Sequence, residues 1–291
     1  MTEPLVAVII VNWNTRELLK QCLEAVYNTI RGVEFEVWVV DNASTDGSAA
    51  LVRDAFPEVR LIENAQNLGF ARANNQALEK CTGRYALLLN SDAFLGAGAA
   101  AALIKALEAD PRAGIAGARL VYLDGRAQRS YSRLPGLLGE VGSLLGLDKL
   151  NQGAGGREKG DMKEVGAVSG ACLLARRAML AQIGLLDERF FMFSEEIDLC
   201  RRALAAGWKV VHVPAAQVVH LGGGSSGLTA GRVLQLYKGK LQYFEKHFGL
   251  NTSHILFIAM RATSRMKAWC YALTSPRKAA LWREVCRGLT R

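Results

Sequence analysis

The sequence lacks several signatures that would assign it to a common class of nucleotide-binding, zinc-binding or secreted protein. No CxxC pair occurs among its cysteines, no GxGxxG follows its first apolar run, and no GxxxxGK[ST] is present. These absences argue against a zinc module, a Rossmann dehydrogenase and a P-loop NTPase. No apolar run reaches about 18 residues, and no basic segment precedes the first run, so neither a transmembrane helix nor a secretory signal is predicted.

The composition is that of a globular chain with a strongly basic end. Its 291 residues are 50% hydrophobic, enough for one large α/β domain or for one domain with an appendage. The six scattered cysteines are typical of buried thiols in a reducing compartment, so a cytoplasmic location is expected. The net charge is +9, and much of it lies beyond Gly231. A basic tail can bind nucleic acid, bind an anionic membrane or remain solvated.

Short apolar runs and helical patterns alternate through the first half of the chain. Leu5–Trp13 is an almost unbroken run rich in β-branched residues, as in a buried parallel strand. Arg16–Thr29 follows with its apolar residues on one helical face, and Thr15 is its expected N-cap. The same alternation predicts further strands at 35–42, 59–64 and 84–90 and helices at 44–56 and 68–81. It predicts an α/β fold with a doubly wound, mostly parallel sheet.

Two regions depart from this alternation. Residues 123–164 are rich in Gly, Arg and Ser and have weak periodicity, which indicates a long insertion. Beyond Leu228 the chain has two or three amphipathic patterns with basic faces. We therefore expect one α/β domain at 1–228 and a basic, amphipathic helical extension at 229–291.

Polar side chains follow each of the first four predicted strands. The carboxyl ends of parallel strands meet at one edge of a sheet, and ligands bind at that edge. In the absence of glycine loops, a nucleotide could be held by a carboxylate or by a helix start such as that after Gly69. The simpler alternative is that these loops are merely polar. The residues concerned are Asn12 and Asn14, Asp41 and Asn42, Asn64 and Asn67, and Asn90, Ser91 and Asp92.

Seven motifs in order resemble those of a known family. They are VAVIIVNWN, VVDNASTDGS, NLGFARANNQAL, YALLLNSDAFL, VSGACLLARR, FFMFSEEIDLCRRALAAGW and VVHLGGGSS. Over residues 5–226 the chain resembles the inverting glycosyltransferases of family 2, and among these the rhamnosyltransferase-like branch. The resemblance implies the GT-A fold, in which a twisted, mostly parallel sheet flanked by helices binds a nucleotide sugar.

The resemblance also implies which residues bind the donor. Asp41 takes the position of the family's aspartate that hydrogen-bonds the nucleobase. Arg72 and Asn74 fall in the segment that lines the nucleotide and the sugar. Asp46 is the next acid of the same motif, and it could equally be a helix N-cap. The remaining donor-binding candidates are Asn12, Asn14, Asn42, Asn67, Asn90 and Ser91.

The family's metal-binding Asp-X-Asp corresponds here to Asn90-Ser91-Asp92, so the first carboxylate is missing. The resemblance assigns the divalent cation to Asp92. His220 matches a position that completes the metal site in some members, although a lone histidine can equally be structural. An oxygen-rich site of this kind suits Mg²⁺ or Mn²⁺.

The acidic cluster SEEIDL corresponds to the family pattern Glu-Asp-X-Asp-Leu, whose second acid is the general base. Glu196 holds that position and is the first candidate for the base. Glu195 is the second candidate, and Asp198 completes the catalytic set. The alternative is a helix start that is rich in acids because they favour the helix dipole.

The resemblance implies an inverting glycosyltransferase that uses a UDP- or dTDP-linked sugar, with rhamnose as a candidate. The acceptor would be a glycan or a lipid-linked hydroxyl in cell-surface polysaccharide synthesis. A nucleotidyltransferase and a non-catalytic nucleotide-sugar-binding protein are the alternatives. The basic tail has the composition of an interfacial helix on an anionic membrane, which would make the protein peripheral on the inner face of the cytoplasmic membrane. No nucleic-acid module is recognised, so no nucleic-acid partner is expected.

Overall fold

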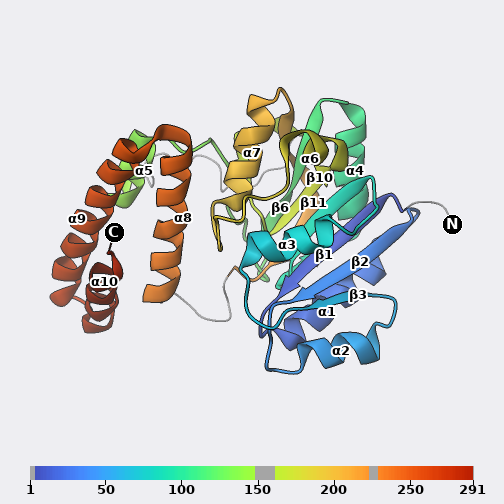
Figure 1. The fold of residues 1–291 in the computed structure, drawn as a ribbon, viewed down its shortest axis with the longest axis horizontal. Helices are drawn as coiled ribbons and strands as arrows, with labels where there is room; N and C mark the ends of the chain where they lie inside the picture. Colours follow the sequence, from blue (N-terminus) through green and yellow to red (C-terminus); the bar gives the residue numbers. More distant parts are fainter. Residues whose placement is uncertain (1–3, 148–160, 223–228, 291) are drawn as a thin grey trace. The chain divides into compact units, whose positions relative to one another are not determined.

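The computed structural model describes residues 4–147, 161–222 and 229–290 and contains two compact units (Figure 1). The predicted division at residue 228 lies at the end of a segment outside these described residues. The first unit comprises Met1–Leu134, Ala154–Phe191 and Glu195–Gly222, and the second comprises Pro135–Gly153, Met192–Ser194 and Gly223–Arg291.

A mixed sheet forms the centre of the first unit. Its strand order is β3-β2-β1-β4-β10-β6-β11-β5, and β8 pairs with β11. A separate pair is formed by β7 (Tyr131–Ser132) and β9 (Ala167–Val168). The strands of the large sheet are β1 (Val6–Asn12), β2 (Phe35–Asp41), β3 (Arg60–Glu63), β4 (Tyr85–Asn90), β5 (Ala93–Leu95), β6 (Ala113–Val121), β8 (Lys163–Glu164), β10 (Cys172–Arg176) and β11 (Lys209–His220).

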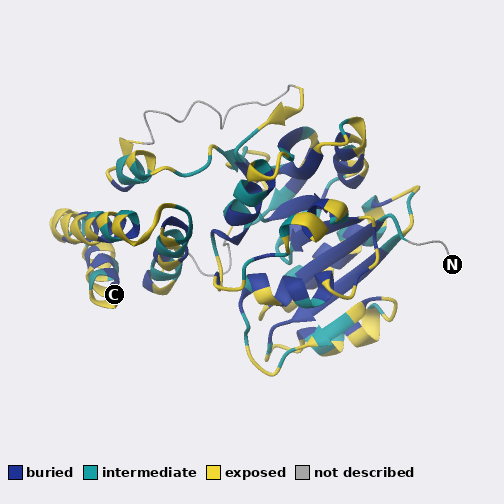
Figure 2. Ribbon diagram, turned by 45° about the horizontal axis from the view of Figure 1, so that its top comes forward, coloured by how far each residue is buried: buried dark blue, intermediate teal, exposed yellow. Residues whose placement is uncertain are grey.

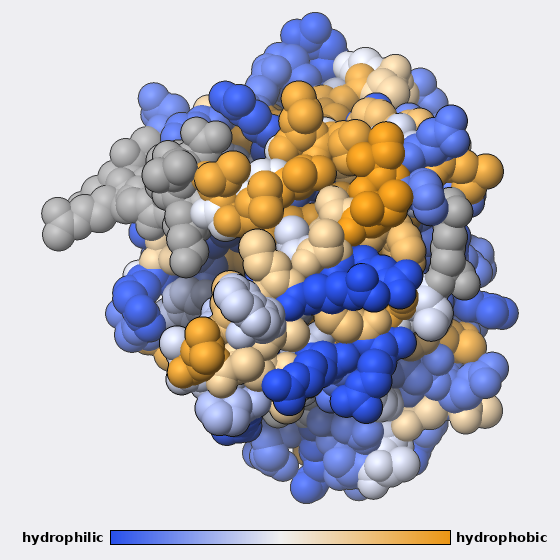
Figure 3. All heavy atoms as spheres, turned by 90° about the vertical axis from the view of Figure 1, so that its left-hand side faces the viewer, coloured by the Kyte–Doolittle hydropathy of each residue, from blue (hydrophilic) through white to orange (hydrophobic). Residues whose placement is uncertain are grey.

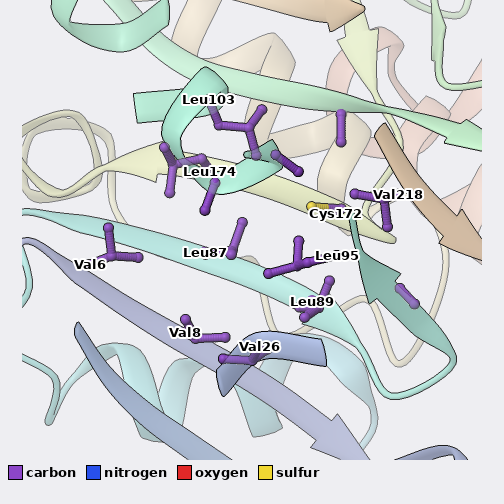
Figure 4. Close-up of a cluster of buried hydrophobic side chains, with 14 of the residues drawn as sticks. Val6, Val8, Val26, Leu87, Leu89, Leu95, Leu103, Cys172, Leu174 and Val218 are labelled. Atoms are coloured by element: carbon purple, nitrogen blue, oxygen red, sulfur yellow. The ribbon is translucent and has the colours of Figure 1, made fainter. Parts of the chain in front are cut away.

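Alternate residues of the central strands face opposite sides of the sheet, and helices cover both sides. Val8 of β1 and Leu87 of β4 belong to one core (Figure 4), whereas Ile9 and Leu88 belong to the other. The first core is covered by α1 (Arg16–Thr29), α2 (Ser48–Ala55) and α4 (Ala99–Ala109), and the second by α3 (Phe70–Leu78), α6 (Arg177–Ile183) and α7 (Glu195–Ala205). Because both faces are buried (Figure 2), β1 and β4 are apolar up to their polar last residues.

The parallel register of β1 brings three strand ends to one level. Asn12 pairs with Asp41 of β2, and Val11 pairs with Asn90 of β4. The three polar strand ends predicted from the sequence therefore lie side by side. This confirms the expected parallel core.

The remaining strands are less regular than the sequence pattern suggests. β10 runs antiparallel between β4 and β6, and β11 pairs in parallel with β6 but antiparallel with β5. The pairing of β11 with β5 sets His220 opposite Ala93, the residue after Asp92. The antiparallel pairing of β5 with β11 thus joins two motifs that are far apart in the sequence.

Three local expectations differ from the structure. Thr15 occupies the N-cap position of α1, but its side chain makes no capping hydrogen bond. The insertion at 123–164 contains regular elements, among them α5 (Leu137–Leu144), although residues 148–160 lie outside the description. Among the cysteines, Cys270 is exposed and Cys286 is partly buried, whereas the other four are buried as expected.

The second unit is helical. It contains α5, α8 (Ala230–Phe248), α9 (Leu250–Ala272) and α10 (Pro276–Gly288), and α9 packs against the other three. Thr229 caps α8 by accepting a hydrogen bond from the Arg232 amide at 3.2 Å. Within the described ranges, no helix combines the length and the apolar character that crossing a bilayer requires.

Candidate active site

A chain of hydrogen bonds joins the ends of β2, β1 and β4. The buried Asn12 amide donates to Asp41 Oδ1 at 3.1 Å and accepts from Thr15 Oγ1 at 2.6 Å. Thr15 Oγ1 also lies 2.9 Å from Ser91 Oγ. Thr15 therefore does not cap α1, because its hydroxyl is engaged in this chain. Asp41 and Ser91, predicted separately as donor-binding residues, belong to one polar network.

The loops after β1 and β2 are tied to each other. The backbone N–H of Ser44 donates to Asp41 Oδ2 at 2.9 Å. The Ser44 hydroxyl accepts from the backbone N–H of Asn14, also at 2.9 Å. Asn14 and Ala43 both have positive φ, 52° and 64°, which is unfavourable for residues with a Cβ. Strained backbone of this kind concentrates at sites where a particular loop shape is needed.

Asp46 has a structural role in this region. It accepts from the Arg16 amide at 2.8 Å and from Ser48, so it holds the starts of both α1 and α2. Slight burial would raise the pKa of Asp46, but these hydrogen bonds outweigh it and lower the pKa. Gly47 holds the N-cap position of α2, so Asp46 is not the N-cap itself, although it accepts a hydrogen bond from the Ser48 amide at the start of that helix.

A second polar cluster follows β2 and β3, and we call Asn42, Asn64, Asn67 and Gln76 the amide cluster. Asn42 Nδ2 donates to Asn67 Oδ1 and to Gly69 O, both at 3.1 Å. Its Oδ1 accepts from Asn64 Nδ2 at 2.9 Å and from an amide of the following loop. Every polar atom of the Asn42 side chain is therefore occupied within the protein. The structure gives Asn42 and Asn67 a loop-shaping role, and their donor binding stays a prediction.

Helix α3 positions the segment that leads to α7. A Cβ at Gly69 would lie 2.4 Å from Phe191 O, so only glycine permits this close approach. Asn75 exchanges hydrogen bonds with the Leu186 backbone. The predicted donor-binding residue Asn74 is buried and donates to Phe70 O, within its own helix.

Arg72, the other predicted donor-binding residue of α3, is more than half exposed. Its Nε lies 3.7 Å from Glu188 Oε2. An exposed guanidinium in a loose ion pair can turn toward an anionic ligand at little cost. Arg72 is therefore the cation of α3 that remains accessible to a phosphate group.

The fold brings the two predicted metal-binding residues together. Asp92 Oδ1 lies 3.3 Å from His220 Nε2, and both side chains are largely buried. The Leu221 backbone amide donates to Asp92 O at 3.1 Å, which ties the segment after β4 to the segment after β11. Of the motif VVHLGGGSS, residues 223–226 lie outside the described residues.

The chemistry of this pair fits a cation. Gln128 Nε2 donates to His220 O, and this leaves Gln128 Oε1 to face His220 Nδ1 at 2.9 Å. A proton on Nδ1 satisfies that contact, so Nε2 is the ring nitrogen that faces the Asp92 carboxylate, where it can donate a proton or bind a metal ion. Two acceptors at this distance repel unless a proton or a metal ion joins them. Within the described residues no group of three or more His, Cys, Asp or Glu side chains is arranged for a metal.

Glu196 is linked to the Asn90-Ser91-Asp92 motif through the loop before β10. The backbone N–H of Asn90 donates to Ala171 O at 3.0 Å. A Cβ at the neighbouring Gly170 would lie 3.4 Å from Glu196 Cβ, so this side chain passes directly over the glycine. The predicted base and the predicted metal motif therefore flank the same short loop, with Glu196 partly exposed.

Glu195 and Glu196 occupy different environments although they are adjacent. Glu195 is buried, and its Oε2 has no hydrogen-bond partner among the described residues. Burial and, to a smaller extent, the negative charge of Glu196 raise the pKa of Glu195 well above its ordinary value. Burial thus favours the protonated form of Glu195, whereas Glu196 is only partly buried, with its Oε2 inside the protein.

Asp198, the third predicted catalytic acid, is fully buried in an ion pair. Its Oδ2 lies 2.8 Å from Arg202 Nε. The same guanidinium donates to the carbonyl oxygens of Ile183, Gly184 and Leu185. Through these contacts Asp198 and Arg202 attach α7 to the end of α6. A catalytic role of Asp198 stays a prediction.

Several residues of this region were not predicted from the sequence to be functional. Ser44 and Gln128 enter only through hydrogen bonds formed by folding, and Gly170 only through its contact with Glu196. Trp13 is 54% exposed between Asn12 and Asn14, at the edge where the polar network lies. An aromatic residue next to two polar strand-end residues was a visible signal, because an exposed indole offers a flat apolar face to a planar ligand.

Comparison with known sequences agrees with these features. The family described as glycosyl transferase family 2 matches residues 7–184. N-acetylglucosaminyl-diphospho-decaprenol L-rhamnosyltransferase of Mycobacterium tuberculosis is 34% identical over 204 residues, 63% of this chain and 66% of the relative. The low-salt glycan biosynthesis hexosyltransferase Agl10 of Haloferax volcanii is 26% identical over 219 residues, 74% of this chain and 66% of the relative. The resemblance to the rhamnosyltransferase-like branch is confirmed.

Solved structures share the fold. Mannosyltransferase PcManGT from Pyrobaculum calidifontis, in complex with GDP-Man and Mn²⁺, has a TM-score of 0.62 at 19% identity and covers 99% of this chain and 85% of that one. GalNAc-T7 with UDP, GalNAc and Mn²⁺ has a TM-score of 0.57 at 15% identity. The match covers 94% of this chain and 58% of that one. The predicted GT-A fold is thereby confirmed. Since the family match extends over more than half of the chain, the protein belongs to glycosyl transferase family 2.

Proposed function

We propose that the protein is a metal-dependent inverting glycosyltransferase of cell-surface polysaccharide synthesis. It moves a sugar, with rhamnose as the first candidate, from a UDP- or dTDP-linked donor to a hydroxyl of a lipid-linked or glycan acceptor. The Mycobacterium relative is named as an L-rhamnosyltransferase of N-acetylglucosaminyl-diphospho-decaprenol. A lipid-linked acceptor would bring the reaction to the inner face of the cytoplasmic membrane.

One observation carries this proposal. A continuous set of contacts runs from Asp41 through Asn12 and Thr15 to Ser91, and the adjoining loop at 170–171 reaches Glu196. Donor-binding and proton-accepting groups thus line one edge of the sheet. A protein that only bound nucleotide sugars would have no use for a partly exposed carboxylate beside the donor.

The donor would lie with its nucleoside part at the Asp41 end of this edge. The Asp41 carboxylate accepts from N–H or hydroxyl groups of the nucleoside, and the exposed Trp13 ring offers a surface for the base. Asn12 and Ser44 orient the Asp41 carboxylate through their hydrogen bonds. Arg72 can turn from Glu188 to the diphosphate.

Asp92 and His220 would hold the divalent cation. The solved neighbours that contain Mn²⁺ support this assignment by analogy of fold. Two protein ligands suit Mg²⁺ or Mn²⁺, because such ions keep several positions for substrate phosphates and water. When bound, the ion neutralises charge on the departing nucleoside diphosphate.

Glu196 would be the general base. Its carboxylate accepts the proton of the acceptor hydroxyl while the oxygen attacks the anomeric carbon from the side opposite the diphosphate. The bond to the diphosphate breaks in the same displacement, so the anomeric configuration is inverted. Burial favours the protonated form of Glu195, which lessens the negative charge beside Glu196.

A donor panel tests the proposal. The purified chain is incubated with UDP-, dTDP- and GDP-sugars, with Mn²⁺ or with EDTA, and thermal stability and donor hydrolysis are followed. We expect a UDP- or dTDP-sugar to raise the melting temperature, and to be hydrolysed slowly, only with the metal. If no nucleotide sugar binds, or if the protein makes nucleotide sugars from sugar phosphates and nucleoside triphosphates instead, the proposal is wrong.

A further inference from the structure

Helix α9 has two apolar faces, and among the described residues only one of them is covered. Its buried face, which packs in the second unit, contains Leu256, Phe257, Met260 and Ala268. On the opposite side, apolar residues recur every three or four positions and are exposed, which defines what we call the outer stripe. The outer stripe consists of Ile255, Ile258, Ala262, Met266, Trp269 and Leu273.

The outer stripe is strongly exposed for a set of large apolar side chains. Trp269 is 72% exposed and Leu273 is 82% exposed. Figure 3 presents the left-hand side of Figure 1, where α9 is labelled, and on it apolar side chains gather beside elongated hydrophilic ones. Scattered exposed apolar residues are ordinary, but a continuous stripe along a helix indicates a binding surface.

Positive charge accompanies the outer stripe. Helix α9 contains no acidic residue, and Arg261 and Arg265 are exposed one turn from Ile258 and Trp269. Residues 229–291 contain 12 Lys and Arg and 2 acidic residues. The preceding 228 residues contain 24 Lys and Arg and 25 acidic residues. The whole positive excess of the chain therefore lies in the part that carries the outer stripe.

We propose that the outer stripe of α9 docks on an anionic lipid bilayer, with Ile258, Trp269 and Leu273 entering the interface and Arg261 and Arg265 contacting lipid phosphates. An apolar face bordered by arginines complements a negatively charged, amphipathic surface. An aromatic residue such as Trp269 is favoured at the level of the headgroups. This inference rests on the proposed function only in that a lipid-linked acceptor gives the docking a purpose.

Vesicle flotation of the full-length protein, without any nucleotide sugar, tests the inference. Phosphatidylcholine vesicles are compared with vesicles that also contain phosphatidylglycerol. We expect flotation with the anionic vesicles only, and its loss at high salt. Ile258→Glu with Trp269→Glu should lower the bound fraction at least tenfold, as follows from placing charges in the apolar interface. Arg261→Gln and Arg265→Gln should each weaken binding about fivefold.

Two matched controls make the result specific. Leu123→Glu changes an equally exposed leucine of the first unit and should float like the wild type. Trp269→Phe keeps an apolar ring and should float, but it should lose the blue shift of tryptophan emission on vesicles. Melting temperatures of all variants are compared to ensure that each is folded.

Three outcomes would overturn the inference. They are failure of the wild type to float with anionic vesicles, flotation of the Ile258→Glu, Trp269→Glu variant at the wild-type level, and a dimer in sedimentation that this variant dissociates. The last result would assign the outer stripe to a second copy of the chain. Donor hydrolysis in the absence of vesicles reports on the proposed function separately, so the two proposals can fail independently.

Discussion

Two polar groups at the same edge of the sheet differ in how completely the protein satisfies them. In the amide cluster, every side-chain polar atom of Asn42 has a partner, and Asn64 and Gln76 exchange two hydrogen bonds at 2.9 Å. The Asp92–His220 pair instead sets a carboxylate oxygen 3.3 Å from an imidazole nitrogen. That contact is favourable only if a proton or a metal ion lies between them.

The difference separates loop-building from chemistry. Amides that are saturated by each other hold a loop in one shape, and they have no bonding capacity left for a ligand. Groups that require an additional positive charge, or that stay partly exposed as Glu196 does, can bind or react. Polar character alone does not distinguish the two kinds of residue, because both follow strands at the same edge. The predictions below test this distinction.

The largest effect is expected for Glu196→Gln. Replacing the partly exposed carboxylate by an amide removes the proton acceptor, so turnover should fall about 1,000-fold while donor binding is kept. Steady-state transfer rates and donor calorimetry measure the two quantities. Glu195→Gln serves as the neighbouring control and should keep most of the activity at neutral pH. If the Glu195 variant loses activity instead, the base is Glu195.

Asp92→Asn should have the next largest effect. Loss of the charge should weaken Mn²⁺ binding and lower metal-dependent transfer about 100-fold. The metal titration of transfer, followed together with calorimetry of the metal, measures this change. Asp46→Asn is the matched control, since Asp46 lies at the same edge but its oxygens are used by two helix starts. Equal sensitivity of the two variants to metal would contradict the assignment of the cation to Asp92.

Asn42→Ala should affect stability rather than chemistry. It leaves the Asn64 amide and the Gly69 carbonyl without their partner, which costs about 2 kcal/mol in the free energy of unfolding. Urea denaturation measures this loss, and the transfer rate per folded molecule should change little. A large fall in donor affinity with unchanged stability would instead make Asn42 a donor ligand, as the resemblance implies.

Glu195→Gln should have the smallest effect, and it should depend on pH. Because burial raises the pKa of Glu195, the folded protein retains a proton that the unfolded chain loses. Above the ordinary pKa of glutamate, wild-type stability should therefore fall by up to about 1.4 kcal/mol per pH unit until the raised pKa is passed. The glutamine variant should lack this slope and be the more stable form at alkaline pH. Denaturation curves across the pH range measure it, and parallel profiles of the two proteins would refute the buried, protonated state.

Much of the first unit could be predicted from the sequence, because its pattern is local. The helix at Arg16–Thr29 was predicted with the bounds that the structure has, and the first four strands were placed within two residues at each end. The insertion of β10 between β4 and β6 could not be predicted. Its apolar residues suit a parallel or an antiparallel neighbour equally, and only packing against both strands decides.

The sequence by itself determined the alternation of strands and helices, the family, and the kinds of residue at the strand ends. Each of these depends on spacing along the chain, which is readable without the fold. Only the tertiary structure decided which polar groups are satisfied, that Asp92 faces His220, and which apolar face of α9 is covered. The reason is physical: these properties depend on partners far away in the sequence, and strand order and helix packing bring such partners together.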